Sequence, residues 1–490
     1  MQKLQKVRFK NVALVGLIFL ALTFSLLWAQ DKLSRGIQAY NSGNYDLAIQ
    51  LISGYISTEP NNPEAYYHLG NAHFQKKNFT EAINQYLKAL DKKSKYPECL
   101  YQLGLAYHQN KELDQALKTF QRGLEIKKDL ARFHYGLALV KLAQKDYSGA
   151  DLDLREAIIL EPNKAEYHKA LGDVNMARQV AGIAIEAYKK ALELDSNLTD
   201  IHYNLAKAYL IERNFTQAIN SYKQVVKVKP DFAPAYLELG NIYFLANKYP
   251  EARWALEEYL KFDSTNSTVF LSLGKIYYSS RQLPKAIENL NRCLKLNPQT
   301  AEAYFYLGQA YQDSRDFPAA QKAYSDYVRV LKETKPDYQW TNKDADFWFK
   351  NGITNFNLGD SLSLAEAEKS LLKALELDSN QTEAYSYLGL IYYKQKSLEQ
   401  ALVWFTKKVE KDPYNYNGHL NLAYCYLGLN QQDKALESFK KSLELKPDNK
   451  DVRHRLAYIY IDNIKDYALA KEQYEEILKL DSTDCDAKGF

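Results

Sequence analysis

Histidine and cysteine are the side chains of this sequence that could hold a metal ion or act as nucleophiles. Four of the eight histidines, His134, His168, His202 and His419, fall at one place in a repeated pattern where other copies carry an aromatic ring. The first three are 34 residues apart. Consecutive repeats would hold them about 10 Å from one another, the usual distance between packed helices. Zinc needs ligands about 2 Å away. We therefore expect these imidazoles to pack as rings and to bind no metal.

The four cysteines are also poor candidates for chemistry. They are widely separated in the sequence, no two of them form a CxxC motif, and no histidine lies at ligand spacing from any of them. The four are Cys99, Cys293, Cys425 and Cys485. Buried free thiols are expected, although a disulfide stays open in an oxidising compartment. No phosphate-binding loop, GxSxG or HExxH sequence occurs. The sequence therefore predicts no catalytic residue, no cofactor and no metal site.

A repeat of 34 residues positions these side chains. In each copy position 8 is Gly or Ala, and position 20 is Ala in all thirteen copies. Two helices approach closely only where neither carries a bulky side chain, so we expect the two helices of a copy to cross at these sites. Position 32 is often Pro, which stops a helix, or Ser, which can cap the next one. The copies begin at Ala29, Pro63, Pro97, Ala131, Ala165, Thr199, Ala233, Ser267, Ala301, Ala345, Thr382, Tyr416 and Lys450.

Apolar residues recur at helical spacing within each copy. In the copy from Pro63, one stripe runs from Tyr66 to His73 and a second from Ala82 to Ala89. The polar segment 76–78 between them predicts a turn. Each copy is thus expected to form an antiparallel helix pair, and stacked pairs would share one elongated core.

The run AYYHLGNAHFQKKNFTEAINQYLKAL and its copies resemble tetratricopeptide repeats, over residues 29 to about 484. The resemblance implies an all-α fold, a right-handed superhelical solenoid of antiparallel helix pairs. In that family the first helices line a concave groove that binds other proteins. The resemblance therefore implies a scaffold or adaptor without naming its partner.

The repeats divide the chain into blocks. We expect nine contiguous repeats over 29–334, an interrupting loop over 335–344, four further repeats over 345–484 and a tail over 485–490. The interruption could act as a hinge or be a tolerated insertion. No helix is expected after the last repeat. Either the helix over 468–480 caps the array itself through Lys471, Glu472, Glu475 and Glu476, which we favour, or that end meets a partner.

The N-terminus has the organisation of an export segment. Lys3, Lys6, Arg8 and Lys10 precede the apolar run 12–28, and Ala29 offers a small residue before a cleavage point. Residues 1–28 are therefore expected to be a signal peptide or an N-terminal membrane anchor through 12–28, and both alternatives stay open. Either one places the repeats in the periplasm or cell envelope.

The charge balance argues against nucleic acid as a partner. The chain has 64 basic and 60 acidic residues, and the first thirty residues hold four basic residues and no acid. Beyond them the chain is neutral, and its acidic and basic residues are interleaved. A neutral surface gives no electrostatic attraction for a polyphosphate, so we expect no nucleic-acid binding.

By the resemblance, positions 5, 9 and 12 of each first helix face the groove. Aromatic rings there would suit an extended peptide, because rings supply contact area at low entropic cost. The alternative is that the array itself partly buries many of these rings. Asn71 matches one position of the carboxylate clamp of chaperone-binding members, but the lysine partners are missing. The candidate groove residues are Tyr67, Asn71, Phe74, Tyr101, His108, Tyr135, Tyr203, Phe244, Tyr278, Phe305, Phe349, Phe356 and Tyr393.

The leading hypothesis is a non-catalytic protein-interaction scaffold, exported to the cell envelope, that binds a peptide or protein along the groove. A glycan-binding solenoid and a regulatory subunit of an envelope enzyme complex are the alternatives. A peptide groove should keep Asn and Gln near its rings, whereas a sugar site should cluster acids and Trp. The scarcity of Trp at the groove positions favours peptide.

Overall fold

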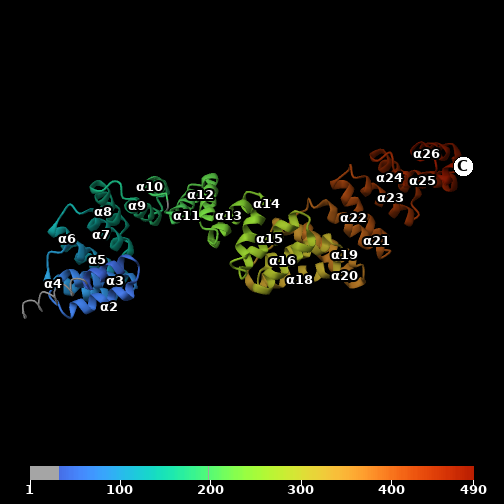
Figure 1. The fold of residues 1–490 in the computed structure, drawn as a ribbon. Helices are drawn as coiled ribbons and strands as arrows, with labels where there is room; N and C mark the ends of the chain where they lie inside the picture. Colours follow the sequence, from blue (N-terminus) through green and yellow to red (C-terminus); the bar gives the residue numbers. More distant parts are fainter. Residues whose placement is uncertain (1–31, 197, 490) are drawn as a thin grey trace, which may run out of the picture. The chain divides into compact units, whose positions relative to one another are not determined.

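The computed structural model describes residues 32–196 and 198–489, and every regular element among them is a helix (Figure 1). The predicted signal peptide or anchor at 1–28 lies outside the described residues. Across the described part of the chain, no helix combines the length and the apolar character needed to cross a membrane.

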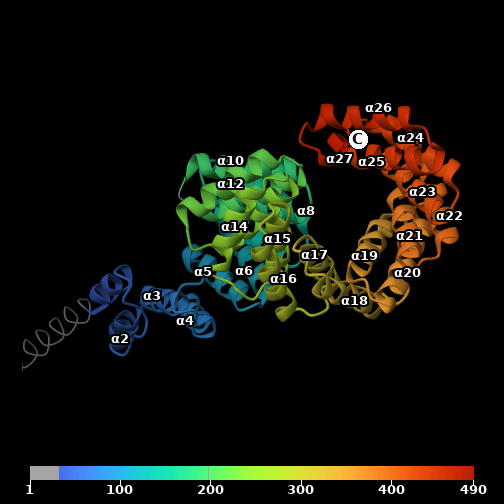
Figure 2. The ribbon, with the colours of Figure 1, turned by 90° about the vertical axis from the view of Figure 1, so that its right-hand side faces the viewer.

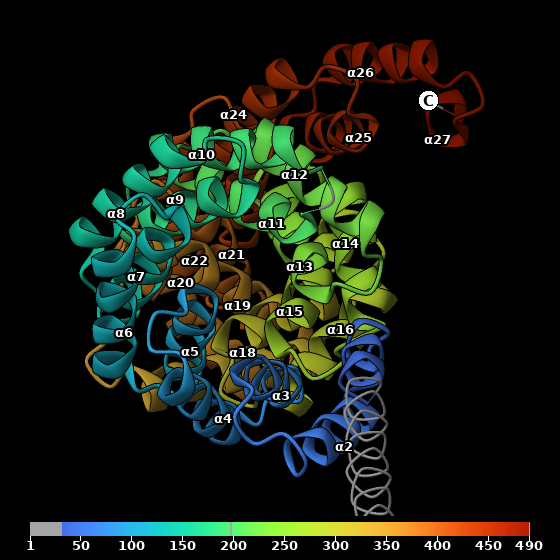
Figure 3. The same ribbon diagram turned by 60° about the vertical axis from the view of Figure 1, so that its left-hand side comes forward.

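Residues up to Ile242 form the first of two compact units. In this unit helices in the order of the chain pack on one another, and Figure 3 shows α5 to α12 following one another along a curve. Residues 32–41 are helical and precede the labelled elements. The helices are α2 (Tyr45–Ile56), α3 (Pro63–Gln75), α4 (Phe79–Lys92), α5 (Pro97–Gln109), α6 (Leu113–Ile126), α7 (Ala131–Ala143), α8 (Tyr147–Leu160), α9 (Ala165–Ala177), α10 (Ala181–Leu194), α11 (Thr199–Ile211), α12 (Phe215–Val228) and most of α13 (Ala233–Leu245).

The second unit runs from Tyr243 onwards. Figure 2 shows its helices α17 to α25 in chain order along a second curved array. They are α14 (Tyr249–Leu260), α15 (Ser267–Ser279), α16 (Leu283–Leu296), α17 (Ala301–Asp313), α18 (Phe317–Thr334), the 3-10 turn η1 (Asn342–Asp344), α19 (Ala345–Leu358), α20 (Ser361–Leu377), α21 (Thr382–Lys394), α22 (Leu398–Lys411), α23 (Tyr416–Gly428), α24 (Gln432–Leu445), α25 (Lys450–Ile459), the π-helical η2 (Tyr460–Ile464), α26 (Tyr467–Leu480) and α27 (Cys485–Gly489). The stacked helix pairs confirm the predicted all-α solenoid.

A short turn, three residues long in eleven of the thirteen copies, joins the two helices of a copy. After α3, the Lys77 N–H donates to the Phe74 carbonyl and the Asn78 N–H to the His73 carbonyl, both at 2.9 Å. These two hydrogen bonds end the helix, and Lys77 adopts the left-handed backbone conformation, with φ 60°. Asn78 then caps α4 through its side chain. The same position has a positive φ in every copy, as Gly43, Lys77, Lys111, Lys145, Gln179, Arg213, Asn247, Arg281, Arg315, Gly359, Lys396, Asn430 and Lys465.

The small residues at positions 8 and 20 lie where the two helices of a copy cross. All thirteen alanines at position 20 are fully buried. A Cβ on Gly70, at position 8, would lie 2.5 Å from Cε1 of Tyr86. Tyr86 stands at position 24, and the equivalent Phe120 is likewise fully buried. In these two copies the glycine lies directly against a large side chain four residues beyond the alanine, a contact that the sequence pattern did not predict.

Consecutive copies pack through a second complementary pair of positions. Gly123, at position 27, lies against Phe133, at position 3 of the next copy. Between the copies from Thr382 and Tyr416 the small residue is at position 3 and the large one at position 27. A Cβ on Gly418 would lie 3.5 Å from Cγ of Lys408. A large residue on one helix thus meets a small one on the next, which keeps the core closely packed.

Insertions change the helices of two copies without changing the stacking. α20 has 17 residues where α22 and α24 have 14, so it absorbs the three extra residues of its copy. The single extra residue of the last copy forms the π-helical turn η2. The loop predicted at 335–344 extends only to Thr341, because Thr341 and Asp344 form a capping box that starts η1. The two units divide within α13, and the hinge at the interruption stays a prediction.

The C-terminal end differs from the sequence-based expectation. Residues 485–489 form the short helix α27, which packs on α26, whereas we expected a tail and a self-capping last helix. The Asp484 carboxylate accepts a hydrogen bond from the Ala487 N–H at 3.1 Å and from His454 Nε2 at 3.0 Å. Ala487 is buried. A turn capped by Asp484 therefore covers the last repeat, which the low apolar content of this segment had concealed.

Candidate functional site

The predicted groove residues lie on first helices, as expected, but few of them are open to solvent. Tyr393 is 42% exposed, and the other twelve are half-buried. Seven belong to the first unit and six to the second. The half-buried residues are Tyr67, Asn71, Phe74, Tyr101, His108, Tyr135, Tyr203, Phe244, Tyr278, Phe305, Phe349 and Phe356.

The rings at position 5 pack against the following copy. The ring centre of Tyr101 lies 6.0 Å from that of Phe133, with the rings perpendicular. The ring centres of Tyr135 and Tyr167 lie 5.0 Å apart, and burial raises the pKa of Tyr101 and Tyr135. Offset and edge-to-face ring pairs stabilise such contacts. These tyrosines therefore join neighbouring repeats, as the alternative explanation for the groove rings predicted.

Asn71 has a structural partner within its own copy. The Tyr86 hydroxyl donates to Oδ1 of Asn71 at 2.7 Å, so the amide at position 9 satisfies a buried phenol at position 24. The same relation joins Tyr188 to Asp173, at 2.7 Å. Tyr222 has no such acceptor, because Lys207 stands at position 9 and its ammonium can only donate. The resemblance of Asn71 to a clamp residue is thus explained by packing.

Asp173 is the titratable group on this face with the most unusual surroundings. It accepts hydrogen bonds from the Tyr188 hydroxyl and from Nδ2 of Asn204, the second at 3.1 Å. Burial raises its pKa, and the two hydrogen bonds offset only part of that rise. Lys169 lies beside it but pairs with Asp200. The carboxylate therefore bridges two repeats.

Two of the histidines at position 4 bond a backbone carbonyl. Nε2 of His168 lies 2.8 Å from the Pro162 carbonyl, and Nε2 of His419 lies 2.9 Å from the Pro413 carbonyl. The hydroxyl of Tyr66 donates to the Pro60 carbonyl at 3.1 Å in the same geometry. In these copies position 4 thus bonds the carbonyl six residues earlier, at the end of the preceding copy, whereas His134 faces the Asp153 carboxylate. A Pro followed six residues later by Tyr or His is the signal that could have revealed this.

One small pocket lies on the predicted binding face of the first unit. It has a volume of about 150 Å³ and is formed by Asp200, Tyr203, Asn204, Val225, Lys229 and Phe232. The ring centre of Tyr203 lies 5.2 Å from that of Phe232, and the Lys229 ammonium lies 5.3 Å from the centre of the Phe232 ring. The pocket thus combines aromatic and aliphatic side chains with one acid, Asp200, and one base, Lys229.

Lys408 is a buried charge that the sequence reasoning missed. It is fully buried, and its ammonium lies 2.7 Å from Oε1 of Glu383 and 3.1 Å from Oδ2 of Asp412. Burial opposes ionisation of Asp412, but hydrogen bonds from Lys408 and Asn415 lower its pKa. A charged residue at position 27, which is uncharged in the other copies, was the available signal.

The cysteines are free thiols in the structure. Cys99, Cys293 and Cys425 are buried, and Cys485 is exposed. Burial raises the pKa of Cys425 to about 11 and that of Cys99 to about 12, so neither is a thiolate at neutral pH. Within residues 32–196 and 198–489, no three His, Cys, Asp or Glu side chains gather as a metal site would require.

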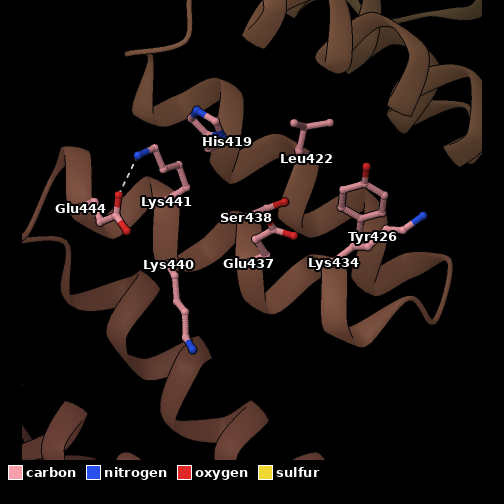
Figure 4. A pocket seen from close by; sticks show the side chains of 9 residues that line it. All are labelled: His419, Leu422, Tyr426, Lys434, Glu437, Ser438, Lys440, Lys441 and Glu444. Carbon is pink, nitrogen blue, oxygen red and sulfur yellow. Dashed lines mark hydrogen bonds and ion pairs between the residues drawn. The ribbon is translucent and has the colours of Figure 1, made fainter.

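The larger pockets of the second unit lie away from the groove positions. Figure 4 shows one of about 580 Å³, where His419, Leu422 and Tyr426 of α23 meet side chains of α24. A second, of about 550 Å³, places Tyr304 and Tyr311 of α17 beside Lys322 and Asp326 of α18. Both contain position 4 of a first helix and side chains of the second helix of the same copy, and α16 also lines the pocket beside Tyr304. Neither pocket contains a predicted groove residue.

Comparison with family models agrees with this geometry. Models described as TPR repeat match residues 70–111, 183–210 and 274–314. Three further models are described as tetratricopeptide repeat. One matches residues 203–267 and 357–416, the second matches 97–130 and 416–449, and the third matches 451–484. The chain is a tetratricopeptide repeat protein. Residues 131–182 match none of these models, yet α7, α8 and α9 of this TPR protein continue the same helix pairs. No curated protein sequence matches it significantly.

A search of solved structures finds matches to this TPR protein at low sequence identity. TTC0263, a thermophilic TPR protein in Thermus thermophilus, is 24% identical and covers 37% of this chain and 99% of its own, with a TM-score of 0.33. YrrB, described as a TPR protein with an unusual peptide-binding site, is 21% identical and covers 41% and 97%, with a TM-score of 0.36. The APC/C hetero-tetramer Cut9–Hcn1 is 15% identical and covers 94% of both chains, with a TM-score of 0.33.

Proposed function

We propose that this TPR protein is a non-catalytic scaffold that binds an extended peptide along the first helices of its first unit, with the Tyr203 pocket as the anchor. Membership of the family supports an interaction scaffold in general. The observation that carries the specific proposal is the pocket of about 150 Å³ on the predicted binding face.

The size and chemistry of the pocket favour one apolar side chain of a peptide. A cavity of about 150 Å³ with apolar walls is large enough for a benzene ring. Tyr203, Val225 and Phe232 provide such walls, while Asp200 and Lys229 stand at the rim. Charged groups at the rim of an apolar pocket orient a ligand more than they add affinity. We expect the bound peptide to carry a Phe or Leu anchor with a polar neighbour.

Substitution of the predicted groove tyrosines is a poor test, because Tyr101 and Tyr135 also join the repeats. Reversal of a rim charge leaves that packing intact. Peptides should therefore be selected from a displayed random library and titrated against the wild type and Lys229→Glu. Lys223→Glu, on the exposed side of α12, carries the same change of charge and serves as the control.

We expect Lys229→Glu to weaken the selected peptides by about fivefold or more, since a rim charge contributes roughly 1 kcal/mol. Lys223→Glu should bind as the wild type does. If both variants bind equally, or if no peptide with an apolar anchor is enriched, the Tyr203 pocket is not the anchor. Cross-linking in the native cell would then identify the partner independently of the pocket.

We further propose that residues 1–28 export the protein, so that the repeats act in the periplasm or at the cell envelope. The basic residues before the apolar run 12–28 support this proposal. Fractionation of cells that express the full chain or a variant without residues 2–28 tests it. The full chain should be found in the envelope or periplasmic fraction and the truncated variant in the cytosol, and equal cytosolic recovery would contradict export.

A further inference from the structure

The repeat that begins at Ala345, directly after the interrupting segment, differs from other repeats in the pocket beside its position 4. The copies that contain Tyr304 and His419 have pockets of about 550 Å³ and 580 Å³ at this place. In the copy from Ala345 the residue at position 4 is Trp348, and the pocket has a volume of about 670 Å³. A second indole, Trp340, lines it as well. Two of the five tryptophans of the chain therefore meet at one pocket.

The inserted segment before α19 brings Trp340 to this position. The Trp340 ring stacks on Phe347, with centres 5.7 Å apart and planes 8° from parallel. Its centre lies 5.0 Å from that of Trp348 at 70°, so the two indoles form a corner. The Tyr338 hydroxyl donates to Oδ1 of Asp344 at 2.8 Å and holds the segment in place. Insertions in repeat proteins often form part of a binding face.

The opposite wall comes from the longer helix α20. Leu372, which is 40% exposed, adds an apolar surface facing the indoles. Glu368, Lys369, Lys373 and Glu376 line the same pocket, so its two carboxylates balance its two ammonium groups. Lys373 pairs with Glu376 at 2.6 Å and Glu368 accepts from the Tyr392 hydroxyl, so each carboxylate has one oxygen left for a ligand. Apolar contact area within a pocket of 300–1,000 Å³ that also carries a few polar groups is typical of a small-molecule site.

This combination fits a ligand that is uncharged, has an apolar face and carries many hydroxyl groups. A pyranose ring has these properties, since its C–H face can stack on an indole while carboxylates accept from its hydroxyls and ammonium groups donate to them. A peptide backbone would be matched better by the side-chain amides of Asn or Gln, and none of the eight side chains that line the pocket is either.

We propose that the pocket between Trp340, Trp348 and α20 binds a carbohydrate. This is a second site, in the second unit, and it does not depend on peptide binding at Tyr203. Maltotriose, cellotriose and tri-N-acetylchitotriose are suitable neutral probes. Binding to the full-length protein would be measured by calorimetry and by saturation-transfer NMR of the sugar.

Three variants make the experiment specific. Trp340→Ala removes the stacking surface from a non-helical segment and should weaken binding at least tenfold. Glu376→Gln keeps the shape of the rim and should weaken binding about threefold or more. Trp404→Ala, in the following repeat and absent from this pocket, is the control and should bind as the wild type does. Circular dichroism would verify that all three variants keep their helices.

The proposal is overturned if none of the three saccharides binds with a dissociation constant below about 10 mM. It is also overturned if folded Trp340→Ala and Glu376→Gln both retain wild-type affinity. A peptide selected on the protein that competes at Trp340, while the sugars do not, would assign the pocket to a polypeptide. Peptide binding at Tyr203 could fail without affecting any of these results, because Lys229→Glu tests that site separately.

Discussion

The hydrogen bond between Tyr86 and Asn71 allows a quantitative test of how the repeats are stabilised. Tyr86 is fully buried, and its hydroxyl donates to Oδ1 of Asn71 at 2.7 Å. In Asn71→Leu the hydroxyl would be buried without a partner, which costs about 1–3 kcal/mol. In Tyr86→Phe the half-buried Asn71 can still reach water, so the loss should be only about 0.5–1.5 kcal/mol. The double variant replaces both groups by apolar ones and should recover much of the loss.

Hydrogen exchange is the suitable assay, because a repeat array opens locally and need not unfold in one step. Amides of α3 and α4 should exchange about 5- to 150-fold faster in Asn71→Leu, since each 1.4 kcal/mol is a factor of ten. The single and double variants together form a thermodynamic cycle with an expected coupling of about 1 kcal/mol. Additive effects of the two substitutions would refute the reasoning.

The copy with Tyr222 provides the matched control. Its buried hydroxyl already lacks a partner, because Lys207 occupies position 9. Tyr222→Phe should therefore leave the stability of α11 and α12 unchanged or raise it, whereas Tyr86→Phe lowers the stability of α3 and α4. Lys207→Asn should stabilise α11 and α12 by about 0.5–1.5 kcal/mol, because it supplies the missing acceptor. Equal losses in both Tyr→Phe variants would show that the phenol contributes by packing alone.

Substitutions centred on Asp173, Lys408 and Gly104 test other parts of the structure. Asp173→Asn should raise the melting temperature at neutral pH, because the raised folded-state pKa of Asp173 makes its ionised form unfavourable in the folded protein. The gain in melting temperature should shrink as the pH falls towards about 4. A gain that is independent of pH would contradict this cause. Lys408→Met should change the free energy of unfolding in urea by less than about 1 kcal/mol. Lys408→Ala should lower it by about 2–4 kcal/mol, because it leaves a cavity. Equal losses in the two variants would instead identify the ion pairs as the stabilising feature. Gly104→Ala should destabilise the protein by about 1–3 kcal/mol by crowding Phe120, and combination with Phe120→Leu should relieve the loss, which a purely conformational effect of the glycine would not allow.

Much of the fold could be predicted because its signals are local and repeated. The small residues at positions 8 and 20, the apolar stripes and Pro or Ser at position 32 identified the helix pairs and their turns. The turn residue was harder to predict, because Lys77 and its equivalents adopt a left-handed conformation for which Gly is the usual signal. The short helix α27 depends on the capping of one turn by Asp484 and therefore leaves no apolar pattern in the sequence.

The candidate sites could be predicted only in part. Tyr203 was a predicted groove residue and does line a pocket, but Tyr101 and Tyr135 pack against the next repeat. The pockets beside Tyr304, Trp348 and His419 lie at a position that was interpreted as ring packing alone. Which side of a ring remains open depends on the residue opposite it in the following copy, and that residue lies roughly one repeat away in the sequence.

The amino-acid sequence specifies the helix pairs, since small residues, helix stops and apolar periodicity act over a few residues and recur in each copy. The distribution of buried and open side chains depends on how successive pairs stack. Gly123 against Phe133, and Lys408 against Gly418, show that the contact between two repeats is a match of sizes across separate helices. The corner between Trp340 and Trp348 likewise exists only because an inserted segment folds back onto α19. Such surfaces arise from packing between distant segments, and no single repeat contains the information for them.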